Sequence, residues 1–196
     1  MSGVSAIILA AGQGVRFGRE PKLLAALNNK PLVRHVAEAV LGSAARPVIA
    51  VLGHRRTAVV NALTELDVIA VDNPAYHEAL STSLKAGFTA LPPTVEAAII
   101  LLGDMPRVNA RLIDRLIDTW RAAERPTAVV PTFGGRRGNP VLLSRIIAPE
   151  ILGLTGDAGA GPLLRHRSGV VELAMDDPAI LLDVDTPKAL SALRLN

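Results

Sequence analysis

The chain has 196 residues, of which 49% are hydrophobic, 20% charged and 3% aromatic, with a formal net charge of +3 and no cysteine. This composition indicates one well-cored globular domain over residues 1–196, and it excludes a disordered chain, a disulfide framework, a thiolate metal site and a cysteine nucleophile. Because the charge balance is mild and no dense run of Lys and Arg occurs, we expect no nucleic-acid partner.

The chain begins with a strand that leads into a glycine-rich loop. Residues 6–11 are apolar, as in a strand buried on both faces, and glycines follow at 12, 14 and 18 with basic side chains at 16, 19 and 22. Glycine lets backbone N–H groups approach a bound anion closely, so the loop predicts a phosphate cradle rather than a simple turn. No secretion signal or membrane-spanning run is found, and we expect a cytoplasmic protein without a membrane partner.

Two familiar phosphate-binding loops do not fit this stretch. The P-loop pattern fails because the distance from Gly12 to Gly18 is one residue too long and Arg19 follows where lysine is required. The dinucleotide pattern G-x-G-x-x-G fails in its spacing. It also requires an acidic residue at the end of the second strand, and that strand ends in Gly53-His54.

The rest of the chain alternates between predicted strands and helices. The expected strands are residues 48–52, 68–71, 97–102, 128–130 and, at the sheet edge, 170–173; the expected helices are 31–41, 56–65, 84–88, 111–123, 161–167 and one starting at 187. This order predicts an α/β fold, a three-layer α/β/α sandwich around a Rossmann-like, mostly parallel sheet.

Polar residues at the strand ends are the candidates for chemistry. Asp104 leaves a fully apolar strand and suits a Mg²⁺ ion that carries phosphates; the alternative, a cap on the next helix, is weakened because that helix starts several residues later. Asp183 and Asp185 lie on one face if their segment is extended, so either is a candidate second metal ligand. The hydroxyls of residues 81–83 favour contact with a base or ribose, or an ordinary helix cap.

Two later glycine-rich segments are candidate ligand loops. Residues 133–143 contain Gly134, Gly135, Arg136 and Arg137, which predict a loop or hairpin near an anion, with a solvated basic turn as the alternative. Residues 153–161 form a second flexible loop before a short helix.

These motifs carry a family resemblance that extends from Ile7 to Leu193. Its strongest parts are Leu9-Ala10-Ala11-Gly12-Gln13-Gly14-Val15-Arg16-Phe17-Gly18 with Pro21-Lys22-Leu23-Leu24, then Gly103-Asp104-Met105-Pro106, and Asp183-Val184-Asp185-Thr186-Pro187. The chain resembles the nucleotidyltransferases with a glycosyltransferase-A-like fold, and most of all the molybdenum cofactor cytidylyltransferases. The resemblance implies transfer of CMP from CTP to a molybdopterin phosphate, with Mg²⁺ as cofactor and a molybdoenzyme or its chaperone as a possible downstream partner.

The resemblance also implies roles for individual residues. The catalytic candidates are Lys22, Arg16 and Asp104; those for the nucleotide are Leu9, Ala10, Ala11, Gly12, Gly14, Lys22, Asn73, Ser81, Ser83 and Asp104; those for the metal are Asp104 and Asp185; and those for the acceptor are Arg137, Gly138, Asn139, Pro140, Gly156 and Asp157. Gly161 stands where the family commonly has arginine. Ala11 resembles the CTP-using version, since the related guanylyltransferases favour glycine there.

Three alternatives stay open at this point. The first is the same chemistry with a sugar phosphate, another phosphorylated acceptor or GTP. The second is a non-catalytic nucleotide-binding regulator, which the presence of Lys22, Asp104 and Asp185 disfavours. The third is an NAD(P)-dependent oxidoreductase, which the loop spacing disfavours.

Overall fold

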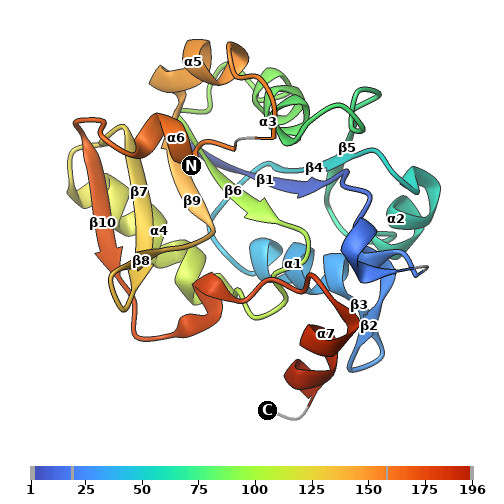
Figure 1. The fold of residues 1–196 in the computed structure, drawn as a ribbon. Helices are drawn as coiled ribbons and strands as arrows, with labels where there is room; N and C mark the ends of the chain where they lie inside the picture. Colours follow the sequence, from blue (N-terminus) through green and yellow to red (C-terminus); the bar gives the residue numbers. More distant parts are fainter. Residues whose placement is uncertain (1–2, 19, 158, 195–196) are drawn as a thin grey trace.

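A computed structural model describes residues 3–18, 20–157 and 159–194, so Arg19 of the basic loop lies outside the described residues. A twisted central sheet carries helices on both faces (Figure 1). The strands are β1 (Val4–Ala10), β2 (Ala26–Leu27), β3 (Lys30–Pro31), β4 (Val48–Leu52), β5 (Ile69–Asp72), β6 (Ala97–Leu102), β7 (Ala128–Phe133), β8 (Arg136–Arg137), β9 (Val141–Ser144) and β10 (Val170–Ala174). The helices are α1 (Leu32–Leu41), α2 (Arg56–Ala62), α3 (Leu80–Thr89), α4 (Ala110–Ala122), α5 (Ala148–Leu152), α6 (Gly161–Leu164) and α7 (Pro187–Arg194).

The central sheet is mostly parallel, which confirms the predicted fold class. Its strand order is β10-β7-β9-β6-β1-β4-β5, with β8 paired to β7. Strands β6, β1, β4 and β5 run parallel to one another, as do β7 and β10, whereas β9 is antiparallel to both of its neighbours. The carboxyl end of β1 therefore lies between the ends of β6 and β4, where ligands bind in open parallel sheets.

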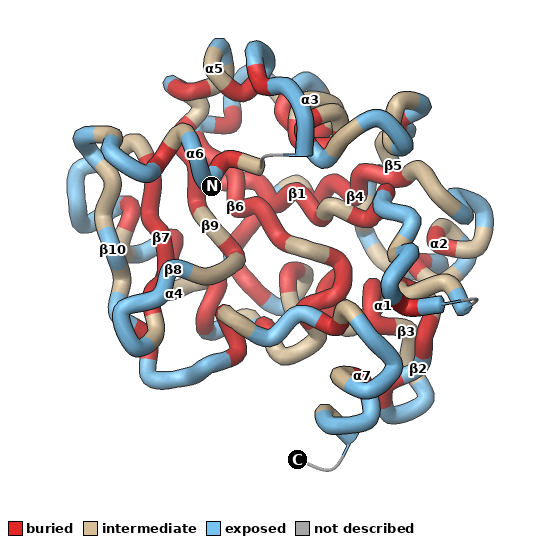
Figure 2. The backbone as a smooth tube through the Cα atoms, viewed as in Figure 1, coloured by how far each residue is buried: buried red, intermediate tan, exposed pale blue. Residues whose placement is uncertain are grey.

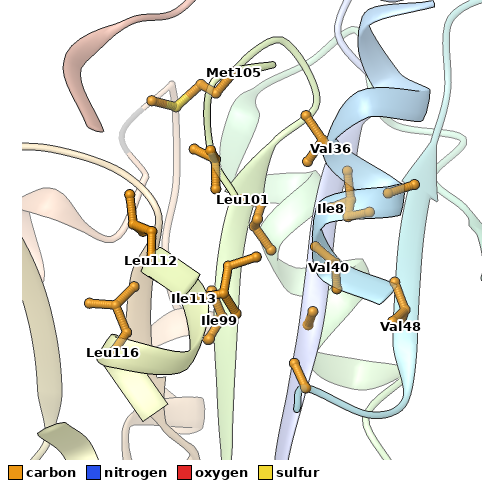
Figure 3. Packing of buried hydrophobic residues seen from close by; sticks show 14 of the residues in the cluster. Ile8, Val36, Val40, Val48, Ile99, Leu101, Met105, Leu112, Ile113 and Leu116 are labelled. Atoms are coloured by element: carbon orange, nitrogen blue, oxygen red, sulfur yellow. The ribbon is translucent and has the colours of Figure 1, made fainter. Parts of the chain in front are cut away.

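Alternate strand residues supply two separate hydrophobic cores, because successive side chains of a strand point to opposite faces. Ile8 of β1 packs in the core that α1, α2 and α4 cover, whereas Ile7 packs in the core under α3, α5 and α6. Figure 3 shows Ile8, Ile99 and Leu101 of the sheet packed with Val36 and Val40 of α1 and with Leu112, Ile113 and Leu116 of α4. The central strands are buried almost throughout (Figure 2).

A third, smaller cluster ties the first loop to the end of the chain. Phe17 and Leu27, on either side of Lys22, pack with Leu32, Val184 and Leu190. This contact brings the segment that carries Asp183 and Asp185 next to the glycine-rich loop.

Several element boundaries differ from the sequence predictions for local reasons. Pro31 was expected to open α1, but its extended backbone (ψ 142°) places it in β3, and the helix begins at Leu32. Helix α2 ends at Ala62 instead of continuing to residue 65, because Glu65 has a φ of 70° that an α-helix does not accommodate. Helix α3 starts at Leu80, so Ser81 and Ser83 lie within its first turn.

The end of the chain follows the prediction in part. Thr186 caps α7, since its Oγ1 accepts a hydrogen bond from the Ala189 N–H at 3.2 Å, and Pro187 is the first helical residue as expected. Helix α6 is shorter than predicted and covers Gly161–Leu164 only. None of the helices in the described ranges is long and apolar enough to span a lipid bilayer.

Candidate functional site

A cleft of about 440 Å³ lies across the carboxyl ends of β6, β1 and β4. Its walls come from segments far apart in the chain: the loop after β1, the segment before α3, the end of β6 and the extended residues before α7. Of the residues predicted from the sequence, those lining this cleft are Leu9, Ala11, Gly12, Gly14, Arg16, Lys22, Ser83, Asp104, Asp157, Asp183 and Asp185.

Three carboxylates meet at one end of the cleft. Asp104, Asp183 and Asp185 each offer an oxygen within 4.8 Å of the others. The Val184 N–H donates a 3.0 Å hydrogen bond to the Asp104 carbonyl, and the Val184 side chain is fully buried. Asp183 and Asp185 flank buried Val184, and the carboxylates of both approach that of Asp104. The sequence left a choice between Asp183 and Asp185, and the fold brings both to Asp104.

The Asp104 carboxylate has one oxygen that only a further ligand satisfies. Asp104 is 7% exposed, and among the described residues its Oδ1 is a buried side-chain oxygen without a hydrogen-bond partner. An unpaired buried carboxylate oxygen is costly. Three convergent carboxylates with a free oxygen fit a hard divalent cation, which prefers oxygen ligands.

Two basic side chains of the first loop lie against this triad. The Lys22 Nζ forms ion pairs with Asp104 Oδ2 and, at 3.0 Å, with Asp185 Oδ1, while Arg16 Nη1 lies 2.8 Å from Asp185 Oδ2. Burial alone lowers the pKa of the Lys22 ammonium, but the Asp104 and Asp185 carboxylates outweigh that effect and raise its pKa above 10.5. Lys22 is therefore a cation at neutral pH.

The glycine at position 14 is what allows this placement of Lys22. Gly14 has a φ of 62°, and a Cβ on it would lie 2.8 Å from the Lys22 Cβ. A side chain there would meet both backbone strain and a clash. Gly12, by contrast, faces open space within 4 Å, and Ala10 is buried beneath the cleft. The loop thus combines a close approach to Lys22 with exposed backbone at Gly12.

The predicted nucleotide-binding residues on the α3 side divide into two groups. Ser83 lines the cleft, whereas Asn73 and Ser81 are buried outside its lining. The Asn73 amide donates to Thr82 Oγ1 at 2.8 Å and to Ser83 Oγ at 3.0 Å, and its oxygen accepts from the Ala75 N–H at 3.1 Å. Asn73 therefore orders the loop and the first turn of α3 from inside.

Tyr76 and His77 also line the cleft, and sequence reasoning assigned them no role. The one available signal was their position in a polar loop directly after a parallel strand.

A second cavity of about 310 Å³ adjoins the cleft, sharing Leu9, Leu80 and Leu102 with it. Three predicted acceptor residues, Arg137, Gly138 and Asn139, line it, and apolar side chains from β6, β7, β9, α3 and α6 form most of its wall. These apolar lining residues were not foreseen, because their pattern in the sequence is that of ordinary core residues.

The other predicted acceptor residues do not line this second cavity. Pro140 is buried, and the Gly156 carbonyl accepts from the Ser81 N–H at 3.4 Å. Asp157 lines the first cleft and accepts from the Leu80 N–H at 3.3 Å. Arg137 carries an ion pair of 2.8 Å with Glu172 and donates to the Leu164 carbonyl at 3.0 Å. The guanidinium at the cavity wall is thus already partnered.

Known proteins show the same architecture over nearly the whole chain. The chain is 29% identical over 196 residues to nicotine blue oxidoreductase of Paenarthrobacter nicotinovorans, covering 97% of this chain and 96% of that protein. The Rv0371c protein of Mycobacterium tuberculosis H37Rv superposes with a TM-score of 0.87 at 26% identity over 98% of each chain, and its manganese complex with a TM-score of 0.80. A nucleotidyl transferase from Methanothermobacter gives a TM-score of 0.83 at 26% identity over 97% and 95% of the two chains. The model of the MobA-like NTP transferase domain matches residues 6–187, and the chain therefore belongs to this family of nucleotidyltransferases.

Proposed function

We propose that residues 1–196 act as one nucleotidyltransferase domain that transfers CMP from CTP to the phosphate of molybdopterin cofactor. An oxygen of the acceptor phosphate attacks the α-phosphorus of CTP, the bond to the β-phosphate breaks, and pyrophosphate leaves with the bonding electrons. The observation that carries the proposal is the triad of Asp104, Asp183 and Asp185 beside Lys22 and Arg16. This arrangement has carboxylates for a metal and cations for phosphates in one cleft.

The proposed metal is Mg²⁺, held by Asp104 and Asp185 with Asp183 beside them. When bound, such an ion neutralises charge on phosphate oxygens. The manganese complex of the Mycobacterium tuberculosis relative supports a divalent cation in this fold. The unpaired Asp104 Oδ1 supports the same assignment from this chain's own side chains.

Lys22 and Arg16 form ion pairs with carboxylates in the structure, and on substrate binding they would exchange these partners for phosphate groups. Lys22 and Arg16 pair with the carboxylates that the metal requires, so metal and triphosphate together replace these ion pairs. We assign Lys22 to the α-phosphate and Arg16 to the departing pyrophosphate. No general base is required, because a phosphate monoester with a second pKa of about 6 is largely ionised at neutral pH.

The remaining nucleotide-binding roles follow the shape of the cleft. Gly12 and Gly14 form the wall under the triphosphate, Leu9 and Ala11 line the cleft toward the ribose and base, and buried Ala10 supports these two residues. Ser83 faces the nucleotide directly. We assign Asn73 and Ser81 an indirect role, since both are buried beside Ser83.

The second cavity is the proposed site of the acceptor. Arg137, Gly138 and Asn139 line it, and Pro140, Gly156 and Asp157 shape the segments beside it. Its largely apolar wall supports an acceptor with a ring system over a sugar phosphate, whose hydroxyl groups need polar partners when buried. No atom lies within 4 Å of a Cβ added at Gly161, so this position lacks the side chain with which the arginine common in the family would contact an anionic acceptor.

The test is an incubation with each of CTP, GTP, ATP and UTP, with Mg²⁺ and either molybdopterin cofactor or a sugar phosphate, in which released pyrophosphate is measured. We expect release with CTP and molybdopterin. Release with sugar phosphate but not with molybdopterin would overturn the proposed acceptor, and release with GTP in preference to CTP would overturn the proposed base. Either result would leave the nucleotidyltransferase chemistry in place.

The Asp104→Asn variant tests the metal assignment. We expect pyrophosphate release to fall by at least about 100-fold, as for loss of an electrostatic group in a reaction centre, while the circular dichroism spectrum stays unchanged. Manganese binding measured by electron paramagnetic resonance should weaken in parallel. Near wild-type turnover in this variant would contradict the assignment of Asp104.

A redox activity is the second candidate, and the whole-length similarity to nicotine blue oxidoreductase favours it. Against it, the glycine loop lacks the dinucleotide spacing, and β4 ends at Leu52 and is followed by Gly53-His54, without a carboxylate. A melting temperature that rises with NADPH but not with CTP and Mg²⁺ would favour the redox activity.

A further inference from the structure

Tyr76 is held in place by close packing at the end of the cleft next to β4. A Cβ on Gly53 would lie 2.5 Å from the Tyr76 Cβ and 2.9 Å from the Ala11 Cβ, so Tyr76 is seated directly on the Gly53 backbone beside the Ala11 methyl group. The His54 N–H donates a 3.0 Å hydrogen bond to the Ala11 carbonyl, which holds the loops after β1 and β4 together. The close approach is possible only because residue 53 has no side chain.

Tyr76 and His77 form an aromatic wall of the cleft, and the His54 ring lies beside Tyr76. The His77 ring lies 5.6 Å from the Tyr76 ring at an interplanar angle of 83°, and the His54 ring lies 6.2 Å away at 55°. Tyr76 is half-buried and His77 is exposed, and both line the cleft. Tyr76 also packs against the core under α3, so its ring is anchored by the core while its accessible part lines the cleft.

The distance from this wall to the acidic triad suits a nucleotide. Asp104 follows β6, whereas Gly53 follows β4, and β1 lies between these two strands. Two strand spacings are about 10 Å. A nucleotide whose α-phosphate lies at the triad therefore has its ribose over the end of β1 and its base at the β4 end.

We infer that the Tyr76 ring is the platform on which the nucleobase stacks. The inference rests on the proposed function. Ala11 is only 2% exposed, and its methyl group faces the Gly53–Tyr76 contact.

The chain offers a direct probe, because Tyr76 is its one tyrosine. Protein labelled with fluorotyrosine has a single fluorine NMR signal, which responds to the ring current of a stacked base. With Mg²⁺ present, we expect CTP to shift this signal and inorganic tripolyphosphate, which has no base, to leave it almost unchanged.

Calorimetry with variants completes the test. Because stacking of a base on an aromatic ring is substantial, we expect Tyr76→Leu to weaken CTP binding by about tenfold or more and Tyr76→Phe to preserve it, with tripolyphosphate binding unchanged in both. His166→Leu removes an exposed ring that does not line the cleft, and it should bind CTP as the wild type does.

The outcomes separate this inference from the proposed function. If wild-type protein binds CTP, but Tyr76→Leu binds it equally well and the fluorine signal does not move, the stacking role is wrong and the transferase assignment stands. If wild-type protein binds neither CTP nor tripolyphosphate, the proposed function fails and the stacking role fails with it.

Discussion

Lys22 is the central cation of the proposed active site. Its side chain is only 16% exposed, and its ammonium group pairs with Asp104 and Asp185, which hold its pKa above 10.5 despite burial. The Arg16 side chain is 80% exposed, and its guanidinium pairs with Asp185 Oδ2. A buried cation at a fixed position stabilises charge that develops on a reacting phosphate better than a solvated one, because no solvent has to reorganise. Lys22 is therefore expected to matter more for the rate than Arg16.

The variant Lys22→Met tests this ranking at the scale of a single residue. We expect kcat to fall by about 100-fold or more with a smaller change in the Kd for CTP, since the lost contact is strongest in the transition state. Steady-state kinetics and calorimetry on the same preparation measure the two effects. The matched variant Arg16→Met should lower kcat less. An unchanged kcat in Lys22→Met would remove Lys22 from the catalytic residues.

At the scale of elements, helix α1 is held to its surroundings by a small ionic cluster. Glu38 of α1 accepts hydrogen bonds from Lys30 of β3 and, at 3.1 Å, from Arg34 one turn earlier in the helix. Arg34 also donates to the Ala62 and Thr64 carbonyls at the end of α2, each at 3.1 Å. The hydrogen bond from Lys30, helped by Arg34, outweighs burial and lowers the pKa of Glu38 below 4.5.

This pKa shift predicts a pH-dependent contribution to stability. A carboxyl whose folded-state pKa is depressed stabilises the protein above its unfolded value of 4.5, and the contribution disappears as the pH falls through the folded-state value. Because the pair is partly solvated, Glu38→Gln should lower the free energy of unfolding by no more than about 1 kcal/mol at neutral pH.

Urea denaturation of wild type and Glu38→Gln at several pH values measures this contribution. The difference between the two proteins should shrink steadily below pH 4.5. Glu124→Gln is the control, because the Glu124 carboxylate has no ion pair in the part of the chain that the structure describes. A difference that stays constant with pH would contradict the ionic explanation.

For the whole molecule, ligand binding joins segments that are far apart in sequence. The cleft takes residues from the first loop, from the segment before α3, from the end of β6 and from residues 183–185. A ligand that contacts all of these binds only the folded chain, so its binding free energy adds to the stability of the whole fold.

CTP with Mg²⁺ should therefore raise the melting temperature more than either component does alone. At 100 times the Kd the stabilisation is about 2.7 kcal/mol, which corresponds to about 5–10 °C for a chain of this length. Differential scanning fluorimetry measures the shift, and Asp104→Asn should lose the part that depends on metal. A larger shift with GTP than with CTP would contradict the proposed choice of base.

The sequence by itself determined the features that depend on neighbouring residues. Apolar runs such as residues 97–102 and the regular alternation with helices predicted the mostly parallel sheet, because a strand buried on both faces is apolar at every position. The glycine loop and Asp104 were identified for the same reason: both directly follow a buried strand, and parallel strands end at one edge.

Only the tertiary structure decided how these parts meet. Lys22 pairs with Asp104 and Asp185 across sequence separations of 82 and 163 residues, which no local pattern encodes. The fold also brought both Asp183 and Asp185 to the triad, turned the Asn73 amide inward to Thr82 and Ser83, and seated Tyr76 on Gly53. Each of these contacts depends on how distant backbone segments pack against one another. The type of a residue limits which partners its side chain is able to bind, but the packing decides which of them it meets.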